Sequence, residues 1–426
     1  MKKWHIICLL CAVLLCFTGC RDYQELDLNG MESVTDKDVL IPTEFSYRAA
    51  QNRPISHSMN RYSMVGDAVY YVHGANIMTY DPATGKSAYL CPDPFCAHDS
   101  NCEFFVSGMP MNVYAADGKL FFWQAGEDGG DVMTMYDTKT AKMTPLYSRA
   151  AAPVMVPSLL YSAPYLYHYT VVAEESEAFT VGDIVLNRYH TETGENTALL
   201  SLSYDGSGYL VGMAGERLIM TVGGQQIEAV TLSEGGATRE VLVASDALGG
   251  MTLSGQPAIL PDGTMIFSTT DKSDAAAVTT HFWSCTVGDG TLRALGEVEG
   301  RVLQGAICYT ETALYFRLEK SFTLGTLIAD NPANSGEITL YYPNFYSLEY
   351  ATGKVESVYE RLPEEYVTCE LNREFFVCGD YIYLPYGHYG EVQADGIYTE
   401  AEMTLGLSGF MRIDMSDGAL CYVGGS

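Results

Sequence analysis

Short runs of aliphatic and aromatic residues alternate with tight polar turns along this chain, and the first clear example lies between residues 67 and 90. The run at 69–72 reads Val-Tyr-Tyr-Val and is followed by a turn at 73–76. The run at 77–80 ends at Asp81-Pro82-Ala83-Thr84-Gly85-Lys86, where Pro presets φ and Gly accepts the left-handed conformation. A third run covers 87–90. Since β-branched and aromatic residues favour strands, the region predicts a strand–turn–strand–turn–strand unit.

This unit recurs to the C-terminus, with its leading turn at residues 67, 117, 163, 215, 262, 311 and 379. A repeat of about 40–50 residues with four short strands is typical of a β-propeller, in which stacked sheets cover one another's faces. We therefore predict an all-β propeller over residues 55–426, with a fourth strand contributed between successive units. Residues 62–65 would form the first strand of the first blade. Seven blades fit best, six or eight are alternatives, and a pair of β-sandwiches is the competing architecture.

Three repeats carry insertions between their second and third strands, at residues 171–183, 320–341 and 386–409. Long insertions in compact domains are often functional or disordered. The two later insertions are rich in tyrosine, as ligand-binding loops on a propeller rim would be. Packed extensions of the blade sheets are an equally good interpretation.

The N-terminus predicts a lipoprotein signal peptide at residues 1–19. Lys2 and Lys3 precede an apolar stretch, 6–17, that is too short to span a bilayer. Phe17-Thr18-Gly19-Cys20 resembles a bacterial lipobox, although Phe17 replaces the usual Leu. Cys20 would then be lipidated and would anchor the protein to the outer face of the cytoplasmic membrane. An ordinary signal peptide with a chance cysteine is the alternative. The polar, acidic residues 20–45 predict a flexible tether.

Charge and motif patterns exclude several classes of function. The chain has 24 Lys and Arg against 53 Asp and Glu, a net charge of −29, which opposes binding to nucleic acid. Neither a phosphate-binding glycine loop nor a dinucleotide-binding pattern is present. Ser207 and Ser254 lie beside glycine but lack the nucleophile-elbow pattern. Adjacent carboxylates at 174–175 and 364–365 are best read as solvated charge, and the histidines are scattered. We assign no catalytic residue.

Three of the 12 cysteines cluster with one histidine. Once residues 1–19 are removed and Cys20 is lipidated, eight cysteines remain: Cys91, Cys96, Cys102, Cys285, Cys308, Cys369, Cys378 and Cys421. The first three and His98 form a Cys-x4-Cys-x-His-x3-Cys pattern. Three thiols and an imidazole complete a tetrahedral zinc set without an open position, which predicts a structural rather than a catalytic metal.

The same spacing leaves other chemistry open. A disulfide, Cys91–Cys96 or Cys96–Cys102, would be expected outside the cytoplasm and would leave His98 as a surface residue. Free thiols are a third interpretation. In each case the loop would connect the outermost strand of the first blade to the innermost strand of the second.

The lipobox, the acidic tether, the Tyr-Tyr strands and the Leu-Cys-x-Asp-Pro-x-Cys-x-His…Cys loop together resemble a family of β-propeller lipoproteins from gut-dwelling clostridial, Gram-positive bacteria. The resemblance covers nearly the whole chain. It implies a cell-surface lipoprotein in which Cys91, Cys96, His98 and Cys102 match the family's loop. It implies no activity.

Two functions therefore compete. The first is a non-enzymatic module that binds a ligand or protein, such as a glycan or a protein partner. The second is an extracytoplasmic lyase or hydrolase that uses carboxylates at the axial mouth to act on glycans. A quinone-cofactor propeller docked by tryptophans is disfavoured, because the chain has only Trp4, Trp123 and Trp283. Fold alone cannot choose between binding and catalysis.

Overall fold

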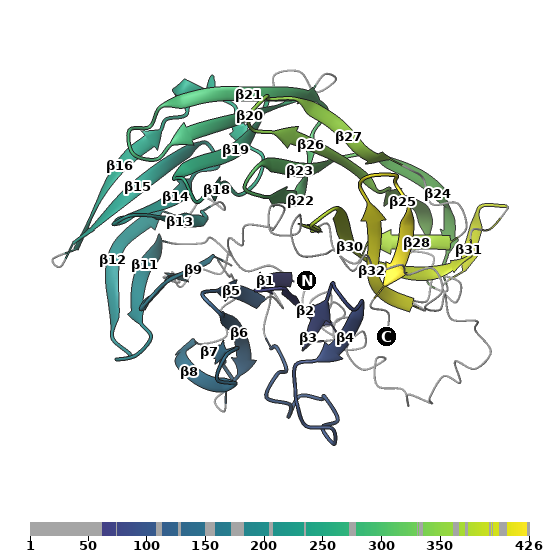
Figure 1. Ribbon diagram of the computed structural model, residues 1–426, viewed down its shortest axis with the longest axis horizontal. Helices are drawn as coiled ribbons and strands as arrows, with labels where there is room; N and C mark the ends of the chain where they lie inside the picture. The colour runs from purple at the N-terminus through teal and green to yellow at the C-terminus, as the bar shows by residue number, and fades with distance from the viewer. Residues whose placement is uncertain are drawn as a thin grey trace. The chain divides into compact units, whose positions relative to one another are not determined.

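The computed structural model of the chain (Figure 1) describes residues 62–73, 75–107, 113–126, 129–149, 158–171, 183–203, 208–233, 236–271, 278–329, 331, 335–360, 366–370, 374–391, 393, 395–399 and 407–423. The chain divides into two compact units, 1–43 and 44–426, and all these residues belong to the second. The predicted signal peptide and tether lie outside the described residues. Among the described residues, no helix is long and apolar enough to cross a membrane.

Within the described part of the chain, seven antiparallel sheets follow one another, and we number them blades 1 to 7. The first four blades contain four strands each: β1 (Tyr62–Val65), β2 (Ala68–His73), β3 (Asn76–Asp81) and β4 (Lys86–Tyr89); β5 (Val113–Ala116), β6 (Lys119–Ala125), β7 (Asp131–Asp137) and β8 (Lys142–Arg149); β9 (Leu159–Ser162), β10 (Tyr165–Val171), β11 (Asp183–His190) and β12 (Asn196–Ser203); β13 (Leu210–Ala214), β14 (Arg217–Val222), β15 (Gln226–Ser233) and β16 (Gly236–Val243).

In two of the remaining blades, the first strand is split into two pieces. The strands of blades 5, 6 and 7 are β17 (Thr252–Leu253), β18 (Ala258–Ile259), β19 (Thr264–Asp271), β20 (Thr279–Thr286) and β21 (Leu292–Glu299); β22 (Val302–Tyr309), β23 (Ala313–Leu318), β26 (Asn344–Glu349) and β27 (Val355–Glu360); β28 (Tyr366–Glu370), β29 (Phe376–Cys378), β30 (Tyr381–Glu391), β32 (Leu407–Asp414) and β33 (Leu420–Val423). In the part of the chain that the structure describes, one short 3-10 helix, η2 (Asp246–Leu248), is the helical element.

The predicted repeat matches the observed blades. Every predicted leading turn lies directly before the second strand of a blade, and β1 is the predicted first strand. Every residue of β23, the second strand of blade 6, is buried. A strand in the middle of a stack of sheets is covered on both faces, so its sequence is apolar throughout rather than alternating.

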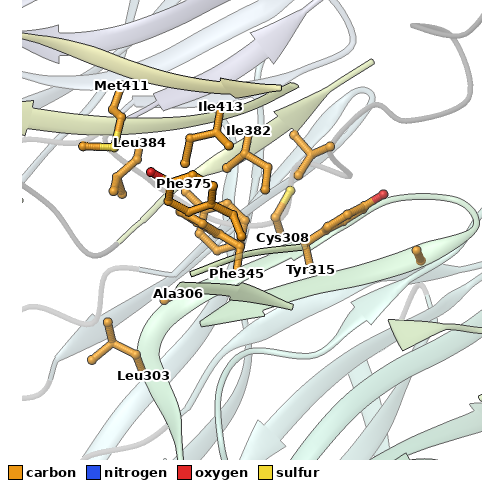
Figure 2. Packing of buried hydrophobic residues seen from close by; sticks show 13 residues of the cluster. Leu303, Ala306, Cys308, Tyr315, Phe345, Phe375, Ile382, Leu384, Met411 and Ile413 are labelled. Atoms are coloured by element: carbon orange, nitrogen blue, oxygen red, sulfur yellow. The ribbon is translucent and has the colours of Figure 1, made fainter. Parts of the chain in front are cut away.

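The hydrophobic core consists of seven clusters, and each fills the interface between two neighbouring blades. Figure 2 shows the cluster between blades 6 and 7, where Phe345 and Phe375 pack among Ile382, Leu384 and Met411. The cycle closes because blade 7 also packs on blade 1, with Tyr80 contacting Tyr383 at 5.7 Å and Phe410 at 5.2 Å between ring centroids. Seven sheets joined in a closed cycle form a β-propeller, as predicted.

An eighth sheet joins two of the predicted insertions. It contains β25 (Gly336–Tyr341), β24 (Ser321–Ile328) and β31 (Ile397–Thr399), in that order. The insertion of blade 6 supplies β24 and β25 as a hairpin, and the insertion of blade 7 supplies β31, which pairs with β24 in parallel. Both insertions therefore contain ordered strands, but in a sheet separate from the blades rather than in simple extensions of them, whereas β30 continues the sheet of blade 7 into its insertion. Of the insertion at 171–183, residues 172–182 lie outside the described residues.

Candidate metal centre and axial pocket

The Cys-His loop connects β4 of blade 1 to β5 of blade 2, as predicted. Its two ends are hydrogen-bonded to the same strand, β3. The amide of Leu90 donates to the carbonyl of Ile77 (2.9 Å), the amide of Ile77 donates to the carbonyl of Phe104 (3.1 Å), and the amide of Val106 donates to the carbonyl of Ala75 (2.6 Å). The loop thus leaves and returns at one place on blade 1.

Two tight turns shape the loop. Asp93 Oδ1 accepts a hydrogen bond from the Phe95 amide (2.9 Å), and Asp99 Oδ1 accepts one from the Asn101 amide (2.9 Å). Such local bonds are the reason that aspartate favours turns. His98 lies between the turns with φ 52°, and its carbonyl accepts a bond from Asn76 Nδ2 (2.8 Å). The unusual left-handed conformation of His98 is thereby held from β3.

The two turns bring together all four residues predicted as ligands. The Sγ atoms of Cys91, Cys96 and Cys102 and a ring nitrogen of His98 lie within 4.8 Å of one another. The separation between Cys102 Sγ and His98 Nδ1 is 4.0 Å. Zinc–sulfur bonds of about 2.3 Å in a tetrahedron place neighbouring ligand atoms roughly 3.5–3.8 Å apart. The donor set therefore fits a tetrahedral metal after the widest pair contracts by about 1 Å.

Burial and backbone amides act on the sulfur atoms of the loop. Burial raises the pKa of Cys102 to about 12; the Phe104 amide opposes this shift, and the neighbouring thiols of Cys96 and Cys91 add to it. At neutral pH the Cys102 thiol is therefore protonated unless a bound cation displaces the proton. Backbone amides already point at two sulfurs: His98 N donates to Cys96 Sγ and Phe104 N donates to Cys102 Sγ, each at 3.4 Å. Amide donors of this kind orient and stabilise metal-bound thiolates. All three thiols are free, so the structure contains neither of the disulfides considered.

The cluster is part of the packing between blades 1 and 2. Cys102, Phe104 and Val106 are buried in the cluster that joins these blades, and Cys91 and Cys96 pack against it. The ring of His98 stacks on Tyr89 at 3.8 Å. Because all four donors come from the protein, a metal here would have no open position for substrate. The arrangement suits a structural metal.

A separate pocket of about 950 Å³ lies among the first strands of blades 1 to 5. First strands of neighbouring blades contact one another, as expected of the innermost strands around a propeller axis. We call this pocket the axial pocket. Its walls include Met64, Leu160, Val211, Met213 and Ile259, and it is also lined by backbone at the leading turns of blades 2, 4 and 5.

Few polar side chains reach the axial pocket. Among the described residues that line it, Asp117 and Asp262 are the charged ones, and both are exposed. Tyr114 accepts a hydrogen bond from the Tyr161 amide (3.0 Å), and burial raises the pKa of Tyr114 to about 12, so this wall carries a neutral phenol. The volume lies within the range of small-molecule sites, and most of the lining side chains are apolar. Sequence reasoning missed this pocket, although the acidic residues at the repeated leading turns were visible in the repeat.

The other residues considered for chemistry are not assembled into a site. His168 is buried, and its ring stacks on Tyr147 at 4.3 Å between ring centroids. His190 Nδ1 accepts hydrogen bonds from two turn amides, Glu192 N at 3.2 Å and Thr193 N at 3.3 Å. His281 Nδ1 lies 3.2 Å from Glu297 Oε2. The hydroxyl groups of Ser254 and Thr270 are hydrogen-bonded to each other. Ser207 and the carboxylate pairs at 174–175 and 364–365 lie outside the described residues, as does the side chain of His388.

Comparison with known proteins supports the fold. No protein-family model matches the chain, and no curated protein is similar to it in sequence. Its structure is similar to an oligogalacturonate lyase in complex with manganese, with a TM-score of 0.52 and 12% identity over 79% of this chain and 86% of the lyase.

Two peptidases are similar as well. A prolyl endopeptidase matches with a TM-score of 0.50 and 13% identity over 89% of this chain and 52% of that one. The acylaminoacyl peptidase of Pyrococcus horikoshii matches with a TM-score of 0.50 and 11% identity over 86% of this chain and 52% of that one. The chain thus spans about half the length of each peptidase. Identities this low show the shared β-propeller fold alone.

Proposed function

We propose that this protein is a lipid-anchored, extracytoplasmic binding module whose propeller captures a ligand or a protein segment in the axial pocket. The supporting observation is the pocket itself, which has apolar walls, two rim carboxylates, and no histidine, lysine, arginine or cysteine among its lining residues. Such a lining offers shape and a charge for recognition. It lacks the neighbouring acid and base that most acid–base catalysis uses.

The anchor in this proposal is a lipid on Cys20. The short apolar segment and the lipobox-like residues 17–20 support it. The acidic residues 20–45 would hold the propeller away from the membrane surface. The net charge of −29 agrees with this arrangement, since it opposes adsorption of the propeller to an anionic surface.

Cys91, Cys96, His98 and Cys102 would hold one structural zinc. When bound, the metal supplies a four-way crosslink between the two turns of the loop. Because the loop also contributes Cys102 and Phe104 to the core between blades 1 and 2, that crosslink would stabilise the contact between these blades. Zinc is favoured among metals because a thiolate-rich tetrahedral set suits it.

The alternative is an enzyme that cleaves glycans at the axial mouth. Asp117 and Asp262 are the carboxylates that the structure places there. A glycosidase needs two carboxyl groups on opposite sides of the scissile bond, one of them protonated. A lyase needs a base beside the proton that it abstracts. Among the described lining residues, no histidine, lysine or other ionisable base accompanies these two carboxylates, so we place binding first.

A screen of glycans, peptides and small metabolites against the purified protein tests this proposal, with binding and turnover scored separately. Saturable binding without turnover, lost when Met213 in the pocket wall is replaced by Trp, is the expected result. Turnover that is lost in Asp117→Asn or Asp262→Asn would establish the enzymatic alternative. Binding that is unaffected by Met213→Trp would place the recognition surface elsewhere.

A further inference from the structure

The charged residues around the axial pocket indicate which class of ligand it can bind. Residues of the leading turns of blades 2, 4 and 5 line this pocket. Six of the seven leading turns carry a carboxylate: Asp67, Asp117, Glu216, Asp262, Glu311 and Asp380. The leading turn of blade 3, Ala163-Pro164, is uncharged. The repeat therefore places acidic groups at one end of nearly every blade.

Nearby basic side chains are already engaged. Arg217, directly after the leading turn of blade 4, donates to the carbonyls of Val287 (2.7 Å) and Gly288 (3.1 Å) and pairs with Glu240. Lys119, directly after the leading turn of blade 2, pairs with Asp137 at 3.2 Å. Asp117 and Asp262 therefore set the sign of the charge at the pocket rim.

The walls below this rim are apolar. Met64, Leu160, Val211, Met213 and Ile259 come from four blades and line the pocket. A site with an apolar wall and carboxylates at its opening is complementary to a ligand with an apolar body and a positive head group. An anionic ligand would face repulsion from two carboxylates, and an uncharged one would gain only from the walls.

We propose that the axial pocket binds an organic cation, an alkylammonium group attached to an apolar chain, with the ammonium at Asp117 and Asp262. The chain of the ligand lies against Met64 and Met213. This inference rests on the proposed function of the propeller as a binding module, and it specifies the class of ligand.

Three eight-carbon probes that differ only in their head group test this assignment: octylammonium, 1-octanol and octanoate at pH 7. The protein is the whole mature chain with Cys20→Ser, so that neither lipid nor detergent competes for the probes. Binding is followed by NMR of 13C-labelled methionine methyl groups. The signals of Met64 and Met213 are assigned by replacing each with leucine.

We expect octylammonium to shift both methyl signals and to bind about tenfold more tightly than octanol, with octanoate weakest. Asp117→Asn and Asp262→Asn together should weaken octylammonium binding by roughly tenfold and leave octanol binding unchanged. Asparagine suits both positions. It tolerates the φ of 50° at Asp117, and it keeps the side-chain oxygen with which Asp262 accepts the Thr264 amide at 2.8 Å.

Glu299→Gln is the matched control. Glu299 is exposed and lies at the end of β21 opposite the turn that adjoins the pocket, so its removal should leave octylammonium binding unchanged. Raising the salt concentration should weaken octylammonium binding alone, since screening acts on the charge contribution. Thermal melting of each variant checks that the propeller remains folded.

The outcomes distinguish failure of the cationic assignment from failure of the proposed binding function. Equal or tighter binding of octanol or octanoate at Met64 and Met213 overturns the cationic assignment and leaves the pocket as a binding site. Octylammonium binding that is insensitive to the two Asn substitutions also overturns it. If none of the three probes shifts the two methyl signals, both the cationic assignment and the axial pocket as the site of recognition are wrong.

Discussion

His98 is the residue at which a metal and a disulfide differ most, because a disulfide has no use for an imidazole. Its conformation, with φ 52° and a carbonyl held by Asn76, directs the ring toward the thiols and within 4.0 Å of Cys102 Sγ. We predict that His98→Ala lowers the zinc content from one per chain to near zero. The melting temperature should fall by roughly 5 °C.

Elemental analysis and thermal melting measure this effect, and His190→Ala is the control. His190 accepts turn amides far along the chain and should not alter the zinc content. Zinc affinity should also fall in acid, because thiolate ligands must lose their protons. Wild-type protein without metal, whose thiols resist alkylation until reduced, would establish a disulfide instead.

We predict that burial of His168 makes the free energy of unfolding depend on pH. Its ring is buried against Tyr147, and this burial lowers the pKa of His168 to about 4, from an ordinary value of 6.5. As the pH falls from 6.5 to 4, the unfolded chain binds a proton that the folded chain does not, so the free energy of unfolding decreases. The decrease from this group reaches about 3 kcal/mol at pH 4.

Replacement of His168 by Phe keeps a ring against Tyr147 and removes the titration. Urea denaturation at pH 7, 5.5 and 4.5 should show a shallower loss of stability in His168→Phe than in the wild type. The two curves would run parallel if the pKa of His168 were the same in the folded and the unfolded protein.

At the scale of elements, the link between the two late insertions depends on a close approach of two glycines. A Cβ on Gly325 in β24 would collide with the carbonyl oxygen of Gly396, the residue before β31. The Thr326 amide also donates to that carbonyl at 2.8 Å. Only a residue without a side chain allows the strands to pair at this point.

Gly325→Ala should therefore separate β31 from β24. Overpacking of this kind costs about 1–3 kcal/mol, and here the loss should be local. Hydrogen exchange should show faster exchange at the amides of 397–399 with little change in the blades. Gly336→Ala in β25 is the control, because an added Cβ there meets nothing within 4 Å. Equal protection in both variants would contradict the role of the glycine pair.

For the whole molecule, the junction of blades 1 and 7 determines whether the cycle of blades is closed. Each blade is built from its own stretch of chain, so this junction in the described residues depends on side-chain packing rather than on a shared strand. Phe410 lies at its centre, 1% exposed, with Tyr71 at 5.0 Å and Tyr80 at 5.2 Å. In the described part of the chain, no strand pairing would hold this junction if the packing failed.

We predict that Phe410→Ala lowers the free energy of unfolding by about 3–5 kcal/mol through the cavity it leaves. Hydrogen exchange should increase first in blades 1 and 7. Val241→Ala, at a residue that is 53% exposed on β16, should change stability by less than about 0.5 kcal/mol. If hydrogen exchange instead increased equally in all blades, the junction of blades 1 and 7 would not open separately from the rest of the propeller.

The proposed attachment to the membrane also concerns the whole molecule. Cys20→Ser should release the protein from the membrane fraction of an expressing bacterium or leave it unprocessed, because the lipid on Cys20 would be its anchor. Phase separation in detergent and labelling with a fatty-acid analogue measure this. Continued lipid labelling of the Cys20→Ser variant would assign the anchor to another residue.

The sequence by itself determined the blades and the composition of the metal cluster. Strand and turn preferences are local, so the repeated leading turn located all seven second strands. The Cys-x4-Cys-x-His-x3-Cys spacing is also local, and two aspartate turns within twelve residues suffice to bring its donors together.

Only the tertiary structure decided how distant parts of the chain meet. The pairing of Thr326 with Ile397, the contact of Tyr80 with Tyr383 and the shared pocket of Asp117 and Asp262 each join residues tens to hundreds of positions apart. Such contacts have no local pattern in the sequence. The last two follow from the cyclic stacking of the blades, which brings blade 7 against blade 1 and leaves the innermost strands to enclose the pocket, whereas the first joins the insertions of blades 6 and 7 outside the blades.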